Sequence, residues 1–200
     1  MPKIIDHDQR RSDIVDVTWD LIIQGGLEAA TMREIAAAAG FANGALKHYF
    51  PSKADIIEAT YIRALDMMRE YVQLDGLRGL AALRELCVST MPIDAERITA
   101  GRVLLTFWQM SLSNQKLHDK YLEHVRSWRG LLHRYITEGR EDGDIATTTP
   151  DEQLVDEVVL LNAGANVMSL VSGEFSTVDL QLRHLESFFE RLTRAAPSGG

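Results

Sequence analysis

Three cations lie close together between residues 31 and 53, and a single carboxylate accompanies them. Arg33, Lys47 and Lys53 stand against Glu34. Clustered lysine and arginine side chains neutralise phosphates, so this local excess of positive charge suits a nucleic acid. The whole chain has a formal net charge of -8, which disfavours a protein that coats nucleic acid without specificity. We therefore expect a small basic surface on an otherwise acidic protein.

The three cations lie on a pattern of helix, turn and helix. Thr31 and Glu34 have the spacing of a capping box, which starts a short alanine-rich helix that stops at Gly40. Asn43 can cap a second helix, and Pro51 breaks it. This spacing is typical of a DNA-binding helix-turn-helix.

The residue types divide this pattern into two faces. Small or apolar side chains on the inner face let the two helices cross closely: Ile35, Ala36, Ala39, Leu46 and Phe50. The outer face carries side chains that can reach base edges or phosphates: Ala45, Lys47, His48 and Tyr49. Tyr49 has the alternative of packing beneath its helix without touching DNA, and His48 that of an ordinary solvated residue.

The remainder of the chain is also helical by its apolar periodicity and its Gly, Pro, Asp and Asn breaks. We predict an all-α fold of about nine helices, over residues 8 to 24, 31 to 40, 43 to 50, 52 to 73, 77 to 90, 94 to 113, 115 to 141, 151 to 173 and 178 to 195. Residues 145 to 149 are predicted to be a loop. We expect a DNA-binding domain over 1–50, a helical regulatory and dimerising domain over 51–196, and a disordered tail over 197–200.

The helical body holds more aromatic and thioether side chains than closure of a small core requires. This surplus predicts a cavity for a small, largely apolar or aromatic molecule. The residues expected to line it are Tyr71, Phe107, Trp108, Met110, Trp128 and Asn162. A cationic ligand is compatible with the π faces of Trp108 and Trp128. A solid core without a cavity is the alternative.

Two apolar stripes near the end of the chain predict a dimer interface. They recur at steps of three and four and comprise Leu154, Val158, Leu161, Ala165 and Met168, then Leu182, Leu185 and Phe189. Two adjacent seams suit a four-helix interface across a two-fold axis. The alternative is that the stripes close the core of one protomer. Asn162 and Asn166, one turn apart among apolar neighbours, need hydrogen-bond partners if they are buried.

Chemistry-bearing residues outside the basic segment do not assemble into a catalytic pattern. His118, His124 and His133 are separated by six and nine residues, which is not the spacing of a helical metal pair. Cys87 is the only cysteine, so one chain has no disulfide, and a reducing cytoplasm fits. No apolar signal core or membrane span is apparent. We expect no enzyme, no metal and no cofactor.

The stretch from about Arg11 to Ile57 resembles the N-terminal domain of the TetR family of repressors. The resemblance lies in Ala39-Gly40, in the run from Gly44 to Phe50, and in Lys53 after a short break. Two positions depart from the family pattern, because Ala42 replaces a capping Ser and Lys47 replaces the first Tyr. Asn43 can supply the cap, and Lys47 a charged phosphate contact.

The resemblance implies a dimeric regulator that binds double-stranded operator DNA and responds to a small molecule. Thr31, Tyr49 and Lys53 would contact phosphates. The residues that would face the major groove are Asn43, Ala45, Lys47 and His48, and the cationic Arg33 is added to the DNA-binding set. The run TFWQMS, Tyr121, Trp128 and the turn GREDGDI also resemble the C-terminal region of betaine-biosynthesis repressors. The competing hypotheses are a constitutive DNA-binding dimer without a ligand and a helical enzyme.

Overall fold

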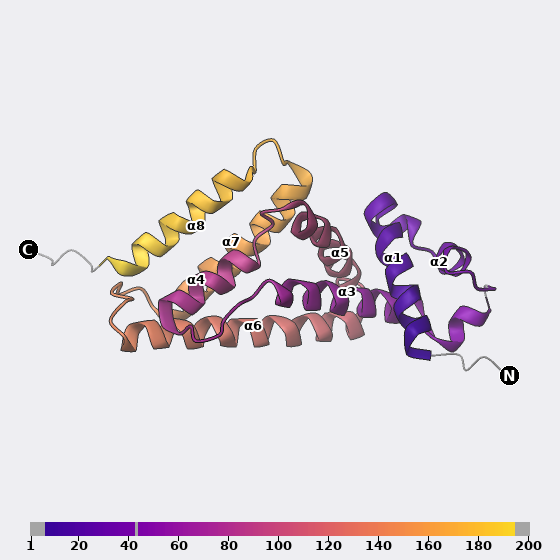
Figure 1. Cartoon of the computed structure of the whole chain (residues 1–200), viewed down its shortest axis with the longest axis horizontal. Coiled ribbons are helices and arrows are strands. Elements are labelled where there is room, and N and C mark those ends of the chain that lie inside the picture. Colours follow the sequence, from indigo (N-terminus) through magenta and orange to yellow (C-terminus); the bar gives the residue numbers. More distant parts are fainter. Residues whose placement is uncertain (1–6, 43, 195–200) are drawn as a thin grey trace, which may run out of the picture. The chain divides into compact units, whose positions relative to one another are not determined.

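A computed structural model of the chain describes residues 7–42 and 44–194 (Figure 1). Within these ranges it is all-helical, as predicted. The α-helices are α1 (His7–Ala29), α2 (Met32–Ala38), α3 (Lys53–Glu70), α4 (Gly79–Ser89), α5 (Ala95–Ser111), α6 (Gln115–Glu141), α7 (Asp151–Val171) and α8 (Val178–Thr193), and a short 3-10 helix, η1 (Ala45–His48), follows α2. The predicted cap at Asn43 and the tail over 197–200 lie outside the described residues.

The first helix continues past its predicted end. The predicted end at residue 24 lies just before Gly25 and Gly26, but α1 runs on to Ala29 with a kink at Gly26, where φ is 69° and ψ is -166°. A positive φ is easily reached only by glycine. The predicted stop is therefore a bend, after which the chain makes one more turn before Thr31.

The helix predicted over residues 43 to 50 is shorter and tighter than expected. Only Ala45–His48 are regular, and they form the 3-10 helix η1. Its N-cap is Gly44, which has no side chain for capping, and Pro51 follows soon after its end. Because so short a segment can close few hydrogen bonds of its own, its shape depends on contacts with the rest of the chain.

The chain divides into two compact units. The first contains residues 1–67 and 102–121, and the second contains residues 68–101 and 122–200. Three helices, α3, α5 and α6, therefore contribute residues to both units. The predicted boundary at residue 50 separates DNA-binding residues from regulatory residues, whereas the two units are defined by how compactly the chain packs. The boundary at residue 50 therefore stays a prediction.

The second unit is built around one apolar core shared by α4, α6, α7 and α8. Most of the residues predicted for the dimer interface are part of it: Leu154, Val158, Ala165, Leu185 and Phe189 are each at most 8% exposed. The burial of these five favours the alternative that they close the core of the protomer. Leu161 and Leu182 are half-buried, and Met168 is 44% exposed.

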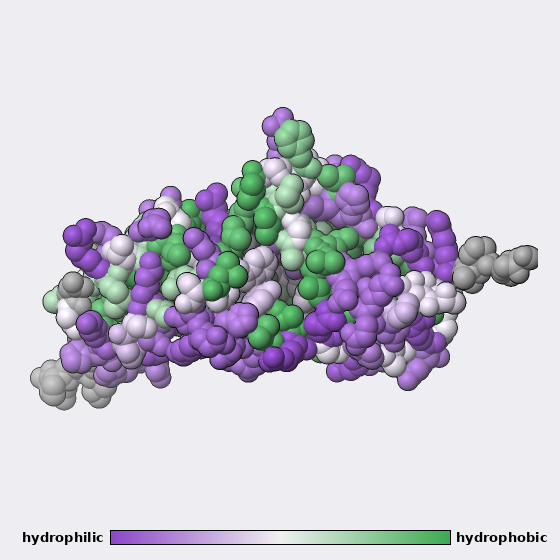
Figure 2. Space-filling view, turned by 180° about the vertical axis from the view of Figure 1, so that it is seen from behind, coloured by the Kyte–Doolittle hydropathy of each residue, from purple (hydrophilic) through white to green (hydrophobic). Residues whose placement is uncertain are grey.

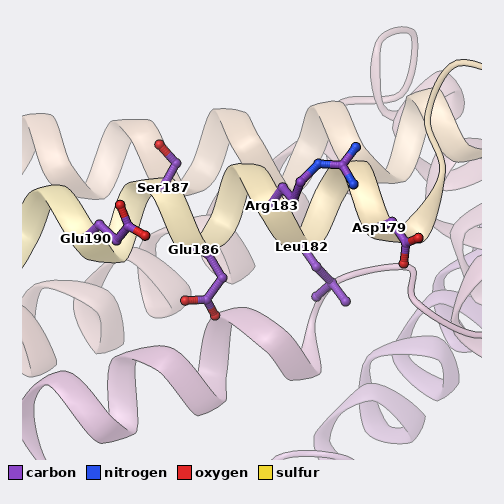
Figure 3. Close-up of a pocket in the computed structure, with 6 residues that line it drawn as sticks. All are labelled: Asp179, Leu182, Arg183, Glu186, Ser187 and Glu190. Carbon is purple, nitrogen blue, oxygen red and sulfur yellow. The ribbon is translucent and has the colours of Figure 1, made fainter.

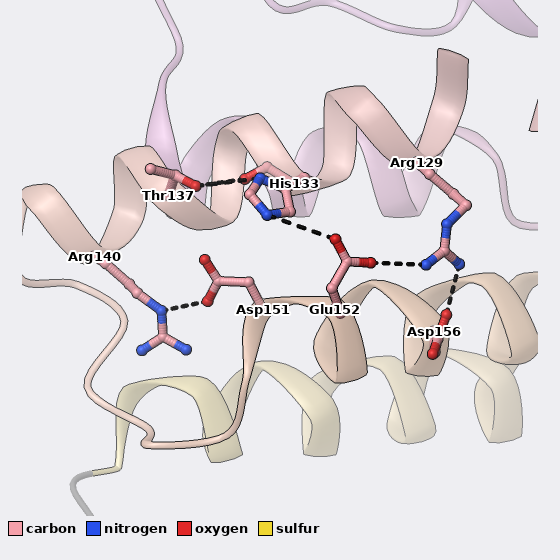
Figure 4. Close-up of polar contacts among 7 residues, drawn as sticks. All are labelled: Arg129, His133, Thr137, Arg140, Asp151, Glu152 and Asp156. Carbon is pink, nitrogen blue, oxygen red and sulfur yellow. Dashed lines mark hydrogen bonds and ion pairs between the residues drawn. The ribbon is translucent and has the colours of Figure 1, made fainter. Parts of the chain in front are cut away.

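Ion pairs join α6 to α7 along the outside of this core (Figure 4). Arg129 reaches Asp156 at 2.6 Å and Glu152 at 3.0 Å. Arg140 reaches Asp151 at 2.6 Å and also donates to the carbonyl oxygens of Thr147 and Thr149. Arg140 thus satisfies backbone acceptors of the segment before α7, and residues 145–149 form a loop as predicted.

Candidate nucleic-acid interface and effector site

The hydroxyl of Thr31 caps α2. Its Oγ1 accepts a hydrogen bond from the backbone N–H of Glu34 at 3.1 Å. The reciprocal half of the predicted capping box is not formed, because the Thr31 N–H donates to the carbonyl of Ala29 and the Glu34 carboxylate pairs with Arg33 at 3.0 Å. Half of the predicted box therefore suffices to start the helix.

The segment from Ala45 to Phe50 has the two faces expected of it. Leu46 and Phe50 are buried, whereas Lys47 and His48 are exposed. Tyr49 is half-buried, and its ring centroid lies 5.2 Å from that of Phe41. Lys47 and His48 are therefore accessible to a partner, while Tyr49 has a packing role whether or not it also touches DNA.

Lys53 opens α3, but its amine already has a partner within the protein. Nζ donates to the carbonyl oxygen of Leu27, near the end of α1, at 3.0 Å. Partial burial lowers the pKa of Lys53, and the nearby Glu28 opposes that effect. Lys53 therefore ties the end of α1 to the start of α3, and its phosphate contact stays a prediction.

Two arginines near the start of α1 were not among the predicted site residues. The guanidinium of Arg11 lies 4.1 Å from the centre of the Phe50 ring and donates to the carbonyl oxygen of Tyr49. Arg10 lies 5.6 Å from the centre of the Phe41 ring. The doublet of cations at the start of the first helix was the available signal, but its contacts join residues about forty positions apart and depend on the fold.

The first turn of α3 is held by a side-chain cap and by an ion pair. Ser52 donates its N–H and its hydroxyl to Asp55, at 3.0 and 2.6 Å. Lys116, in the first turn of α6, lies 2.6 Å from Asp55 and 2.8 Å from Glu58. Hydrogen bonds from Lys116, and then from Ser52, lower the pKa of Asp55. The hydrogen bonds of Lys116 to Asp55 and Glu58 in turn raise the pKa of Lys116.

Three of the six predicted effector residues belong to the first unit. Phe107 is buried and stacks on Tyr61, with ring centroids 3.7 Å apart. Trp108 is half-buried and meets Tyr121 edge to face at 6.2 Å, and Met110 is half-buried. Phe107 is consequently a core residue, and Trp108 and Met110 retain partly accessible surface.

The other three, Tyr71, Trp128 and Asn162, belong to the second unit. Tyr71 donates its hydroxyl to Glu96, and that hydrogen bond raises the pKa of Tyr71 to about 12. Asn162 donates to the carbonyl and hydroxyl oxygens of Thr90, at 2.9 and 3.0 Å. The indole N–H of Trp128 is buried without a hydrogen-bond partner. A single pocket lined by all six residues stays a prediction.

Asn166 shows that the predicted need for partners is only partly met. Its Nδ2 donates to the Asn162 carbonyl at 3.0 Å, whereas its Oδ1 is buried without a partner. The unpaired Oδ1 lies 3.5 Å from the position that a Cβ on Gly101 would occupy. Asn162 and Asn166 therefore form a small polar cluster with Thr90 inside the second unit.

An open depression runs along the outer face of α8 (Figure 3). Its lining is polar except for one leucine and comprises Asp179, Leu182, Arg183, Glu186, Ser187 and Glu190. Glu186 pairs with Arg84 of α4. None of the residues predicted for the effector lies in this depression. Within the described ranges, no group of three His, Cys, Asp or Glu side chains is placed to hold a metal ion.

Comparisons with known proteins agree with this architecture. Residues 14–60 match the family model described as bacterial regulatory proteins of the tetR family, and residues 79–185 match the tetracyclin repressor-like C-terminal domain. The regulator BetI of Escherichia coli O45:K1 is 31% identical over 147 residues, which cover 71% of this chain and 74% of BetI. PksA of Bacillus subtilis is 27% identical over 141 residues, 69% of each chain.

Solved structures share the fold over nearly the whole chain. A putative transcriptional regulator from Saccharomonospora viridis, crystallised in complex with choline, has a TM-score of 0.82 at 24% identity and covers 92% of this chain and 96% of its own. A transcriptional regulator from Rhodococcus has a TM-score of 0.78 at 18% identity, and the match covers 91% of this chain and 95% of the Rhodococcus chain. The chain belongs to the TetR family, and it is a DNA-binding transcriptional regulator with an N-terminal helix-turn-helix and a helical C-terminal domain.

Proposed function

We propose that this regulator is a repressor that a small molecule releases from its operator. The observation that carries the proposal is the course of α3, which begins at Lys53 directly after the helix-turn-helix and continues to Glu70, next to Tyr71. A ligand that shifts the far end of a continuous helix also shifts its start. A preference of about 1 to 3 kcal/mol for the conformation that does not fit DNA changes operator affinity roughly 5- to 150-fold.

The proposed effector is a small organic molecule with an apolar, aromatic or cationic group. Half-buried aromatic side chains such as Trp108 and Trp128 suit such a group, because indole faces attract cations. A structural neighbour was crystallised with choline, a quaternary ammonium compound, which makes choline the first compound to test. The residues proposed to contact the effector are Tyr71, Phe107, Trp108, Met110, Trp128 and Asn162.

The proposed DNA surface is the exposed side of α2 and η1 together with the start of α3. Lys47 and His48 are exposed and are proposed to reach the major groove, and Arg33 has a side chain that is 81% exposed. The other proposed contacts are Thr31, Asn43, Ala45, Tyr49 and Lys53. This surface is small, which agrees with an acidic chain that depends on specific rather than general binding.

The proposed dimer interface differs from the interface predicted from the sequence. The exposed residues Leu160, Gly164 and Met168 follow one another at four-residue steps along α7, and Val171 extends the row. Although α7 is apolar enough in composition to cross a membrane, only 28% of its most apolar window is buried within the chain. Figure 2 shows hydrophobic side chains around the end of α7 and the turn that follows it. A second copy of α7 would bury this row.

A glycine in the middle of the row favours close approach of two helices. The space beside the Gly164 Cα is open, because a Cβ added there would have no atom within 4 Å apart from its chain neighbours and the backbone of its own helix. The separation of packed helices depends on the side chains at their contact. Two-fold symmetry would place two recognition elements about 35 Å apart on one face of DNA.

Regulation, rather than catalysis, is the proposed role of the helical body, because the similar proteins named above are transcriptional regulators. We propose that the protein works in the cytoplasm, where it has access to the chromosome. The domain division at residue 50 is proposed on the same functional ground, since the helix-turn-helix ends there.

Two measurements on one sample test the proposal. A duplex is first selected from random DNA by the purified protein, and choline and a panel of other small metabolites are then added to the complex. We expect one compound to raise the melting temperature of the free protein and to release the duplex at the same concentration. A panel in which stabilising compounds leave the DNA complex intact would contradict ligand-controlled release.

A further inference from the structure

The short helix η1 has few means of holding its own position. It contains four residues, its N-cap Gly44 offers no side-chain hydrogen bond, and its last N–H bonds come from Tyr49 and Phe50 to the carbonyl of Leu46. A 3-10 turn of this length has weaker hydrogen-bond geometry than an α-helix. The exposed Lys47 and His48 must nevertheless be presented to DNA at a fixed angle.

Arg11 of α1 contacts the chain directly after η1 in two ways. Its Nη1 donates to the carbonyl oxygen of Tyr49, and its guanidinium carbon lies 4.1 Å from the centre of the Phe50 ring. Phe50 is only 1% exposed, so the guanidinium covers the edge of the buried core of the helix-turn-helix. A planar guanidinium can stack on an aromatic ring while its N–H groups donate sideways, which a lysine ammonium cannot do.

The adjacent Arg10 makes a weaker contact on the other side of η1. It lies 5.6 Å from the centre of the Phe41 ring, and Phe41 precedes η1 in the chain. The Phe41 ring is in turn 5.2 Å from Tyr49, which follows η1. The start of α1 therefore touches the residues that flank η1 on both sides.

We infer that Arg11 is a positioning residue for DNA recognition, which fixes the angle of η1 through Tyr49 and Phe50. The inference rests on the DNA-binding function of this chain and adds a residue outside the helix-turn-helix to it. Its competitor is a simpler role in which Arg11 is one more cation that contacts a phosphate. The two roles differ in their salt dependence, because each phosphate contact adds about 0.9 to the slope of log affinity against log salt.

The test compares Arg11→Lys and Arg11→Gln with the parent on a duplex that the parent selects from random DNA. A positioning role predicts that both variants bind roughly tenfold more weakly, with the salt slope of the parent and a broader sequence preference. Arg33→Gln is the matched control for the loss of one positive charge, because Arg33 lies on α2 and pairs with Glu34 rather than with the residues that follow η1. If Arg11→Lys binds as the parent does while Arg11→Gln loses about one unit of slope, Arg11 is a phosphate contact and the inference is wrong.

Hydrogen exchange of the free protein supplies a second measurement that needs no DNA. We expect the backbone amides of residues 45–50 to exchange faster in Arg11→Lys than in the parent, and the amides of α3 and α7 to be unchanged. Arg33→Gln should leave residues 45–50 as they are in the parent. Equal protection of 45–50 in the parent and Arg11→Lys would overturn the inference, whereas a parent that selects no DNA sequence would count against DNA recognition itself.

Discussion

The helix-turn-helix and the helical body use their basic side chains in different ways. Near the DNA-binding segment, Arg11 and Lys53 donate to the backbone carbonyls of Tyr49 and Leu27. In the body, arginines pair with carboxylates instead. The pairs include Arg129 with Asp156, Arg84 with Glu186, Arg140 with Asp151 and Arg191 with Glu157. A carbonyl satisfies the donor without cancelling the charge, whereas a carboxylate cancels it.

This difference explains how an acidic chain can carry a DNA-binding surface. Arg11 and Lys53 keep their positive charge beside the helix-turn-helix, whereas the arginines of the body are neutralised where helices pack around an apolar core. The contrast is not complete, since Arg33 pairs with the adjacent Glu34 on α2, Arg10 with Asp13 on α1, and Lys116 with Asp55 at the start of α3.

The body depends on its apolar core, so the largest loss of stability should come from Phe189. Phe189→Ala removes a side chain that is 1% exposed, and we expect the free energy of unfolding to fall by about 3 to 5 kcal/mol. Denaturant unfolding measures the loss. Leu182→Ala, on the same helix but half-buried, is the control and should cost much less. Similar losses for the two variants would show that the core has been assigned wrongly.

The exposed row on α7 should matter for association rather than for folding. Leu160 is 72% exposed, so Leu160→Glu should leave the unfolding of the protomer nearly unchanged but weaken the dimer at least roughly a hundredfold, about 2.7 kcal/mol. Sedimentation of the variant across a range of concentrations measures the effect. Glu190→Gln on the outer face of α8 is the control. A dimer that survives Leu160→Glu unchanged would exclude this face of α7.

Lys53 tests whether a cation of the DNA-binding region retains its charge for DNA. Lys53→Ala should weaken duplex binding and reduce the salt slope by about 0.9, with a similar sequence preference. Arg129→Gln removes a cation that the body has already neutralised and should leave the slope unchanged. Titrations at several salt concentrations decide between them. If Lys53→Ala lowers stability but not the slope, its only role is the hydrogen bond to Leu27.

The smallest expected effect is a pH dependence of the body. Burial, and then the charge of Arg69, lower the pKa of His124 below its usual value of 6.5. The unfolded chain therefore binds a proton more readily than the folded chain, so stability is full above about pH 6.5 and falls as the pH drops below it. Thermal unfolding of the parent and of His124→Gln between pH 5 and pH 8 measures this, and the variant should show the flatter profile. Identical profiles would contradict the assignment.

The same contrast explains which features could be predicted from the sequence. The helix-turn-helix is a local pattern, so Thr31, Gly40, Leu46 and Phe50 sufficed to predict it. The inner and outer faces of residues 45 to 50 also followed from helical spacing. The 3-10 form of η1 did not, because neither residue type nor spacing shows how few hydrogen bonds a short segment will close.

Long-range contacts could not be predicted in the same way. Apolar periodicity identified the stripes of α7 and α8, but one stripe looks the same whether it faces its own core or a second chain. Leu154 and Phe189 are thus buried in the protomer, while Leu160, outside the predicted set, is exposed. The hydrogen-bond partners of Arg11 and Lys53 could not be predicted either, because they are backbone carbonyls that any residue type could supply.

The most direct test of a dimeric DNA-binding regulator is the stoichiometry of its DNA complex. Sedimentation of the parent with a duplex selected from random DNA gives the mass of the complex without any assumption about the effector. We expect two protomers on a duplex with two related half-sites, and loss of the complex when one half-site is scrambled. A single protomer bound equally well to intact and half-scrambled duplexes would contradict it.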